Sequence, residues 1–393
     1  MERIWFHVAC CAAGLAPLHA EEAQVPPVGA VLVLGQQDLS VFEDPDSYKD
    51  IACTMVRSQP SLDFDLRFHT GFAVTFPLRE LSGLGASTVA VVFRITPENG
   101  TAKYYSRHFR TPAVVEHAGG RVRVVGNIDV GPGKYRVDWL LRDARQRVCS
   151  AHWEVQAKVS GSYPEAALAL GPGEVEPPET ELFEPQPRAA AGPLRVRILV
   201  NLGAGEDTPA VVGILRSIAR EPRIGHVSLV AFNLEDERIL YRQADASQID
   251  FPALGEAVRA RPSGTIDFRQ LGDKNSVAEI LRQLLAMDGA SSEAVDAIIF
   301  TGAKAASDHG ISGETMKLLG NVNCPVFYLA YNSDPAGKPW NDAIGKAVRF
   351  LRGHEYTITR PQDLWTAWRD LMSRLPRGRA LLAATPLDRT SPR

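Results

Sequence analysis

Apolar and polar residues alternate in short runs between residues 61 and 157, which is the period-two pattern of β-strands that bury one face. Turn-forming residues such as Gly131-Pro132-Gly133 separate the runs, and no helical period occurs among them. This spacing predicts an antiparallel β-sandwich over residues 61–157. Its strands are expected at 62–68, 89–95, 103–109, 121–125, 134–142 and 147–156.

From residue 194 to residue 375, apolar strand-like runs alternate with helical periods. Strands are expected at 195–200, 227–232, 238–241, 297–301, 326–331 and 356–359, and helices at 209–220, 276–287, 314–319 and 361–375. The third strand follows a tight turn and should return antiparallel at the sheet edge. The predicted fold class is therefore α/β plus all-β: a doubly wound, mostly parallel sheet preceded by the β-sandwich.

The remaining segments differ in composition from both of these regions. Residues 1–20 have the basic, apolar and small-residue order of a secretory signal peptide, with a short buried helix as the alternative. Residues 21–60 are expected to form an N-terminal extension. Residues 158–193 are rich in proline and glutamate, which predicts a linker, and 376–393 should form a flexible basic tail. We expect an extracytoplasmic protein, periplasmic or secreted, with no membrane span after signal cleavage.

Charge and cysteine content narrow the possible partners and compartment. The 43 basic and 46 acidic residues give a net charge of -3 and form no basic stripe, so nucleic acid is not an expected partner. Outside the signal peptide, three cysteines remain: Cys53, Cys149 and Cys324. A disulfide between Cys53 and Cys149 and a pair of buried free thiols both remain open.

The order of elements in the second region, with an antiparallel third strand and a C-terminal amphipathic helix, resembles the von Willebrand factor A-like fold. Members that bind metal have an Asp-x-Ser-x-Ser loop after the first strand, a Thr before the middle helix and an Asp after the fourth strand. The corresponding positions here are Asn201, Gly203, Gly205, Asn275, Ser276, Thr301 and Gly302. Both carboxylates of the family pattern are replaced by amide and glycine, so the resemblance implies a degenerate site with no metal and no cofactor.

Two catalytic or cofactor sites compete for the same loops. A dinucleotide site is suggested by Gly203-x-Gly205, but the third glycine is missing, and Glu206 and Asp207 would repel a pyrophosphate. No nucleophile elbow and no His-Glu-x-x-His motif occurs, and no histidine stands at ligand spacing from another. We therefore expect no catalytic residues. The alternative is an unrecognised exported hydrolase, whose acid and histidine groups would come from Glu206, Asp207, Asp273, Asp308 and His309.

Residues 133–143 and 148–153 resemble the β-domain that precedes degenerate A-like domains in exported bacterial proteins. That resemblance implies protein–protein recognition rather than catalysis. We therefore expect a non-enzymatic interaction or scaffolding module with a protein partner that the sequence does not identify. The upper face of the second sheet, where the strands end, is the expected contact surface.

Overall fold

The computed structural model describes residues 36–44, 50–81, 87–111, 113–114, 119–159, 168–176, 182–186, 192–202, 207–234, 236, 238–260, 276–286, 295–304, 316–319, 322–333 and 342–375. The chain divides into two compact units, 1–180 and 181–393. The predicted signal peptide and the predicted basic tail lie outside the described residues.

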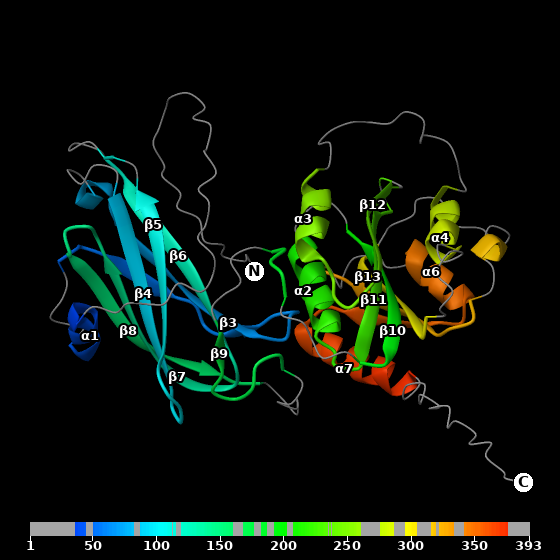
Figure 1. The fold of residues 1–393 in the computed structure, drawn as a ribbon, viewed down its shortest axis with the longest axis horizontal. Helices are drawn as coiled ribbons and strands as arrows, with labels where there is room; N and C mark the ends of the chain where they lie inside the picture. Colours follow the sequence, from blue (N-terminus) through cyan, green and yellow to red (C-terminus); the bar gives the residue numbers. More distant parts are fainter. Residues whose placement is uncertain are drawn as a thin grey trace, which may run out of the picture. The chain divides into compact units, whose positions relative to one another are not determined.

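The first unit consists of two antiparallel sheets (Figure 1). One sheet has the order β1-β3-β6-β9, with β2 also paired to β3. Its strands are β1 (Thr54–Arg57), β2 (Ser61–Leu62), β3 (Phe68–Pro77), β6 (Arg121–Val130) and β9 (Val175–Glu176). The other sheet has the order β5-β4-β7-β8, made of β4 (Ser87–Pro97), β5 (Lys103–Thr111), β7 (Gly133–Arg142) and β8 (Val148–Ala157). A short 3-10 turn, η1 (Leu78–Leu81), follows β3.

Aromatic side chains fill the space between these two sheets. Trp139 is fully buried, and its ring centroid lies 5.4 Å from that of Phe72, which in turn lies 5.3 Å from Phe93. Along β7 the inward positions alternate, so that Tyr135 and Val137 join Trp139 in the core. Burial of these side chains is the main term that stabilises the pair of sheets.

The two sheets are joined by a disulfide at one lateral side and by hydrogen bonds at the other. On one side, a disulfide links Cys53, just before β1, to Cys149 in β8, with Cα atoms 6.3 Å apart. Of the two alternatives that the sequence left open for Cys53 and Cys149, the structure has the disulfide. On the other side, Lys103 Nζ and Tyr105 Oη from β5 donate to the carbonyl of Val175 in β9, at 3.0 and 3.1 Å. Burial, with the nearby charge of Glu176, raises the pKa of Tyr105 to about 12, so its hydroxyl stays a donor at physiological pH.

Helix α1 (Gln36–Glu43) covers part of the outer face of the four-stranded sheet. Phe42 packs with Val92 and Leu140, which both point away from the main core. Arg94 from β4 fixes the end of the helix, because it donates to the Phe42 carbonyl at 2.9 Å and to Glu43 at 2.7 Å. The predicted N-terminal extension at 21–60 therefore contains packed helix and strand.

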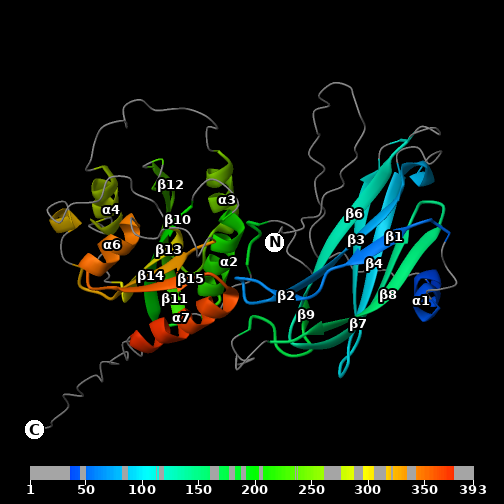
Figure 2. The same ribbon diagram turned by 180° about the vertical axis from the view of Figure 1, so that it is seen from behind.

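The second unit contains one mixed sheet of six strands in the order β12-β11-β10-β13-β14-β15 (Figures 1 and 2). They are β10 (Leu194–Asn201), β11 (Ile224–Asn233), β12 (Arg238–Ala246), β13 (Ala297–Ala303), β14 (Val326–Tyr331) and β15 (His354–Ile358). The helical segments are α2 (Thr208–Ala219), α3 (Phe251–Arg259), α4 (Ser276–Ala286), η3 (Lys317–Leu319), α6 (Ala343–Phe350) and α7 (Pro361–Arg374). No helix in the described part of the chain combines the length and the apolar character needed to cross a membrane.

The predicted fold class, a doubly wound and mostly parallel α/β fold of the von Willebrand factor A type, is wrong for this chain. Of the twelve described strand pairings, eight are antiparallel and four are parallel. The parallel pairings are confined to the mixed sheet. The architecture is therefore mostly antiparallel β-sheet with one mixed sheet. The predicted class followed the second region, whereas all described pairings in the first unit are antiparallel, as hairpin-connected strands such as β4–β5 and β7–β8 must be, and β12 adds one more.

The edge strand β12 is irregular. It pairs antiparallel with β11, and its register shifts twice, between Val227 and Leu229 and between Ala231 and Phe232 of β11. Such shifts place unequal numbers of residues opposite each other and bend the edge strand.

The predicted linker at 158–193 contains residues that pack into each unit. The division at Thr180 and Glu181 falls inside it. Leu170 is buried in the first unit, and β9 pairs with β6. Phe183 is buried in the second unit, against Gly255 of α3. The proline and glutamate content therefore marks the change of unit, but these apolar residues within the segment are folded.

Candidate functional site

Three of the residues expected at the degenerate metal site, Asn201, Thr301 and Gly302, lie at strand ends of the mixed sheet. Asn201 ends β10, between β11 and β13, and is 3% exposed. Its Nδ2 donates to the Ala303 carbonyl at 2.9 Å, and its Oδ1 accepts from the Leu234 amide at 3.1 Å. The side chain thus ties three adjacent strand ends together, as a buried amide must when it leaves water.

The neighbouring residues Thr301 and Gly302 also have structural roles at the end of β13. Thr301 is fully buried, and its hydroxyl donates to the Leu329 carbonyl at 3.3 Å. Gly302 has φ of +122°, and a Cβ built there would lie 2.1 Å from the Asn201 carbonyl oxygen. The glycine at this position is therefore a requirement of the backbone.

The structure gives little information on the other residues expected at the degenerate metal site. Ser276 begins α4, and its side chain lies outside the described residues, as do Gly203, Gly205 and Asn275 entirely. Of the acids and histidine considered for a hydrolase, Asp207 is described. It is the N-cap of α2, and its side chain makes no capping hydrogen bond. Glu206, Asp273, Asp308 and His309 fall outside the described part of the chain.

A cluster of charged side chains in the first unit was not predicted. The turn between β2 and β3 carries Asp65 and Arg67, and β3 carries His69, directly opposite Asp129 of β6. His69 Nδ1 lies 2.7 Å from Asp129 Oδ1, and Nε2 lies 3.0 Å from Asp65 Oδ1. Arg67 bonds to the other oxygen of Asp129 at 3.2 Å and to Glu176 of β9 at 2.7 Å. We call these five residues the His69 cluster.

The charges of the His69 cluster favour a protonated imidazole. Burial lowers the pKa of His69, but the carboxylates of Asp65 and Asp129 outweigh it, through charge and hydrogen bonds, and hold the pKa well above its ordinary value. Both carboxylates are nearly inaccessible, whereas the histidine side chain is 27% exposed. The histidine is therefore the solvent-accessible member of the trio, although each of its ring nitrogens faces a carboxylate.

The sequence does carry a signal for this cluster. Asp63, Asp65, Arg67 and His69 stand at alternating positions, so a strand through them would place four charged or polar groups on one face. The structure instead forms a turn at 63–67, where Leu66 has φ of +60° and its amide donates to the Asp63 carbonyl. The expected strand at 62–68 is wrong because this turn reverses the chain between β2 and β3. The contact with Asp129 depends on the register of β3 and β6, which the local sequence does not show.

A second group of acids lies against α6 in the second unit. Asp342 caps this helix through Oδ1, which accepts from the Ile344 amide at 3.2 Å. The Asp342 Oδ2 and Tyr328 Oη atoms are buried, with no partner of ordinary hydrogen-bond geometry among the described residues. Glu355 shares the space beside Gly345 with Asp342. Burial, and then the charge of Glu355, raise the pKa of Asp342.

We expect Asp342→Asn to raise the free energy of unfolding at pH 7 by about 1 kcal/mol, since it removes a buried charge that burial and Glu355 disfavour and keeps a capping side chain. Because the pKa of Asp342 is higher in the folded state, the wild-type acid does not reduce the free energy of unfolding below its unfolded pKa. The reduction grows as the pH rises towards the folded pKa and is complete above it. The gain should therefore be present at pH 7 and absent at low pH in urea unfolding.

Asp363→Asn is the matched control, at the N-terminus of α7. The pKa of Asp363 is lowered: burial raises it, but hydrogen bonds from Arg360 and Thr359 more than compensate. The same substitution should therefore destabilise the protein at pH 7. Equal effects of both substitutions would contradict this account of Asp342.

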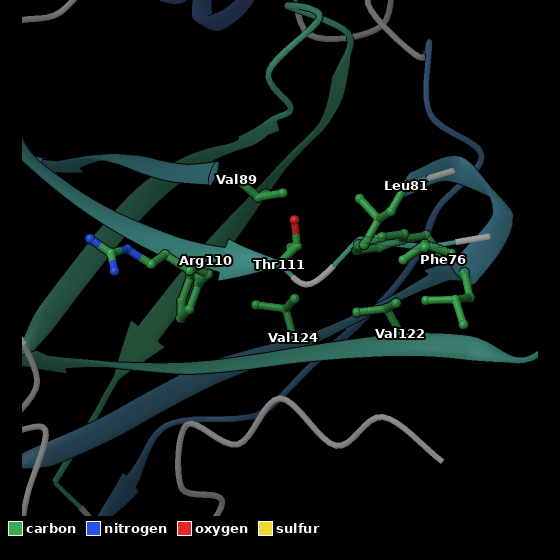
Figure 3. Close-up of a pocket in the computed structure, with 10 residues that line it drawn as sticks. Phe76, Leu81, Val89, Arg110, Thr111, Val122 and Val124 are labelled. Atoms are coloured by element: carbon green, nitrogen blue, oxygen red, sulfur yellow. The ribbon is translucent and has the colours of Figure 1, made fainter. Parts of the chain in front are cut away.

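A small apolar pocket opens between the two sheets of the sandwich (Figure 3). Phe76, Leu81, Val89, Val122 and Val124 line it, together with Arg110 and Thr111 at one side. Its volume of about 30 Å³ compares with ~150 Å³ for a cavity that admits benzene. The pocket is too small for an organic ligand, and its apolar lining offers little to hold a water molecule.

Comparisons with known proteins give little further information. No family model matches the chain, and no curated protein matches it. Among solved structures, the chain is similar to a Bifidobacterium adolescentis GH3 β-glucosidase at 10% identity, over 29% of this chain and 19% of that chain, with a TM-score of 0.17. A Bacteroides uniformis β-glucuronidase matches at 9% identity over 76% and 38% of the two chains, with a TM-score of 0.20.

The PilB minor pilin from Streptococcus sanguinis matches at 8% identity, over 74% of this chain and 88% of that chain, with a TM-score of 0.27. The chain spans about a fifth of the matched β-glucosidase and well under half of the β-glucuronidase. At these TM-scores the similarities support no inference about fold or activity.

Proposed function

We propose that this protein is an extracytoplasmic, non-enzymatic interaction or scaffolding protein, with the strand-end face of the mixed sheet as its contact surface. The observation that carries the proposal is the pair of hydrogen bonds made by the Asn201 side chain. Both polar atoms of its side chain bond to backbone groups of adjacent strands, so the residue at the expected ligand position holds a rigid platform together. A platform of this kind suits recognition of another protein by the loops above it.

The disulfide between Cys53 and Cys149 supports the proposed location. Disulfides form and persist in oxidising compartments such as the periplasm or the extracellular space, and they are rare in the cytosol. The signal-like pattern of residues 1–20 points to the same compartment.

Site-specific photo-crosslinking tests the proposed surface. A crosslinking amino acid is placed at Lys304 or at Asn332, which directly follow β13 and β14, in the full chain expressed in an envelope-containing host cell. The same residue at His226, near the start of β11 and 43% exposed, is the matched control. Light-dependent adducts of one defined mass are expected from the first two positions and not from the control.

Two results would contradict the proposal. One is the absence of any adduct at the strand ends, or equal adducts at all three positions. The other is hydrolysis of ester, glycoside or peptide substrates by the purified protein, abolished by Asp207→Asn, which would favour an enzyme.

A further inference from the structure

The Nε2 side of His69 has two ligand atoms close enough together for a metal site. Its Nε2 and the Asp65 Oδ1 atom are 3.0 Å apart. Zinc binds imidazole nitrogen and carboxylate oxygen at about 2.0–2.2 Å, so one ion beside the line that joins these two atoms can contact both. Ligand atoms of Asp65, His69 and Asp129 all lie within 4.8 Å of one another.

The opposite edge of the ring has the partner that a metal-binding histidine usually has. Nδ1 lies 2.7 Å from Asp129 Oδ1, and Asp129 is 1% exposed and is held at its other oxygen by Arg67. A carboxylate that accepts the second ring N–H fixes the tautomer and the orientation of the imidazole, and it increases the basicity of the free nitrogen. In such a site Asp129 orients His69 while Nε2 faces the ion.

Charge balance in the His69 cluster also favours a divalent cation. In the metal-bound state His69 has lost its Nε2 proton and is neutral, and the three carboxylates of Asp65, Asp129 and Glu176 oppose one guanidinium, that of Arg67. The cluster then carries two net negative charges. A bound divalent ion neutralises them, and its remaining coordination positions are filled by water on the exposed side of the ring.

We propose that the His69 cluster binds one divalent transition-metal ion of the zinc class, with His69 Nε2 and Asp65 as its protein ligands and Asp129 as the residue that positions His69. The ion takes the place of the Nε2 proton, which passes to solvent. Magnesium is excluded by its preference for an all-oxygen set. With two protein ligands, the site holds its ion less tightly than a structural zinc site with four.

Calorimetric titration of the full chain with zinc chloride, after removal of metal by a chelator, tests this site. We expect saturable binding of one zinc ion per chain and none of magnesium. Asp65→Asn keeps an acceptor oxygen for the Arg67 amide and should abolish binding, whereas Asp129→Asn should weaken it by about 10- to 100-fold. His108→Gln replaces an exposed histidine of β5 and should leave binding unchanged.

A second measurement keeps the proposal testable if a variant fails to fold. Cobalt added to the wild-type chain should broaden the ring resonances of His69 at lower concentrations than those of His108. The proposal is overturned by the absence of saturable zinc binding, by binding that Asp65→Asn leaves unchanged, or by equal broadening of the two rings. The cluster is then an ion network that joins β3 and β6.

Discussion

Replacing Cys53 and Cys149 together by alanine should lower the free energy of unfolding of the first unit by about 4 kcal/mol. The disulfide closes a loop with a sequence separation of 96 residues. In the chain-entropy model, a loop of this length restricts the unfolded chain by about 4 to 5 kcal/mol, and loss of native disulfides costs about 2 to 5 kcal/mol in practice. Alanine is preferred to serine, because Cys149 is buried and a hydroxyl there would need a partner.

Urea unfolding of the oxidised wild type, the reduced wild type and the double variant measures this effect. The reduced wild type should unfold near the double variant. Cys324→Ala removes the half-buried free thiol and should change the free energy of unfolding by less than about 1 kcal/mol. If mass spectrometry of the unreduced protein finds Cys53 and Cys149 as free thiols, the structural basis of this prediction is wrong.

Replacing Gly302 by alanine should destabilise the second unit by roughly 3 kcal/mol. An L-residue at φ of +122° is strained by about 1 to 3 kcal/mol, and the new methyl group would meet the Asn201 carbonyl oxygen at 2.1 Å. Since Asn201 and Gly302 are paired in the β10–β13 ladder, relief of this clash must separate the two strands at their ends. Loss of the Asn201 hydrogen bonds would then follow.

Gly119→Ala provides the comparison for this substitution. A Cβ at Gly119 has no atom within 4 Å, so the variant should unfold within about 0.5 kcal/mol of the wild type. Thermal unfolding by circular dichroism separates the two cases. A Gly302→Ala protein as stable as Gly119→Ala would show that the backbone at the end of β13 can move without cost.

The sequence pattern located the strands of the sandwich that alternate clearly. In β7, the period-two arrangement of Tyr135, Val137 and Trp139 matches their burial. The β3 strand escaped prediction because most of its residues are buried and it lacks a polar face, as expected for a strand in the middle of a sheet. Two-residue strands such as β9 have no period to detect.

The candidate sites were predicted less well, for reasons that concern long-range structure. Asn201, Thr301 and Gly302 could be placed at strand ends from the sequence, but their bonds to neighbouring backbones required the sheet order. His69 and Asp129 are 60 residues apart and meet only because β3 and β6 pair in one register. Register depends on contacts that are distant in the chain, so the local sequence does not give it.

The two register shifts along β12 affect how copies of the protein can associate. A regular edge strand offers an even row of N–H and C=O groups on which a strand of another molecule can form. Since the shifts interrupt that row at two points of β12, between 239 and 241 and between 243 and 246, a second copy meets no continuous ladder to extend at this edge. We therefore expect this edge of the mixed sheet to disfavour sheet growth from molecule to molecule when the protein is crowded.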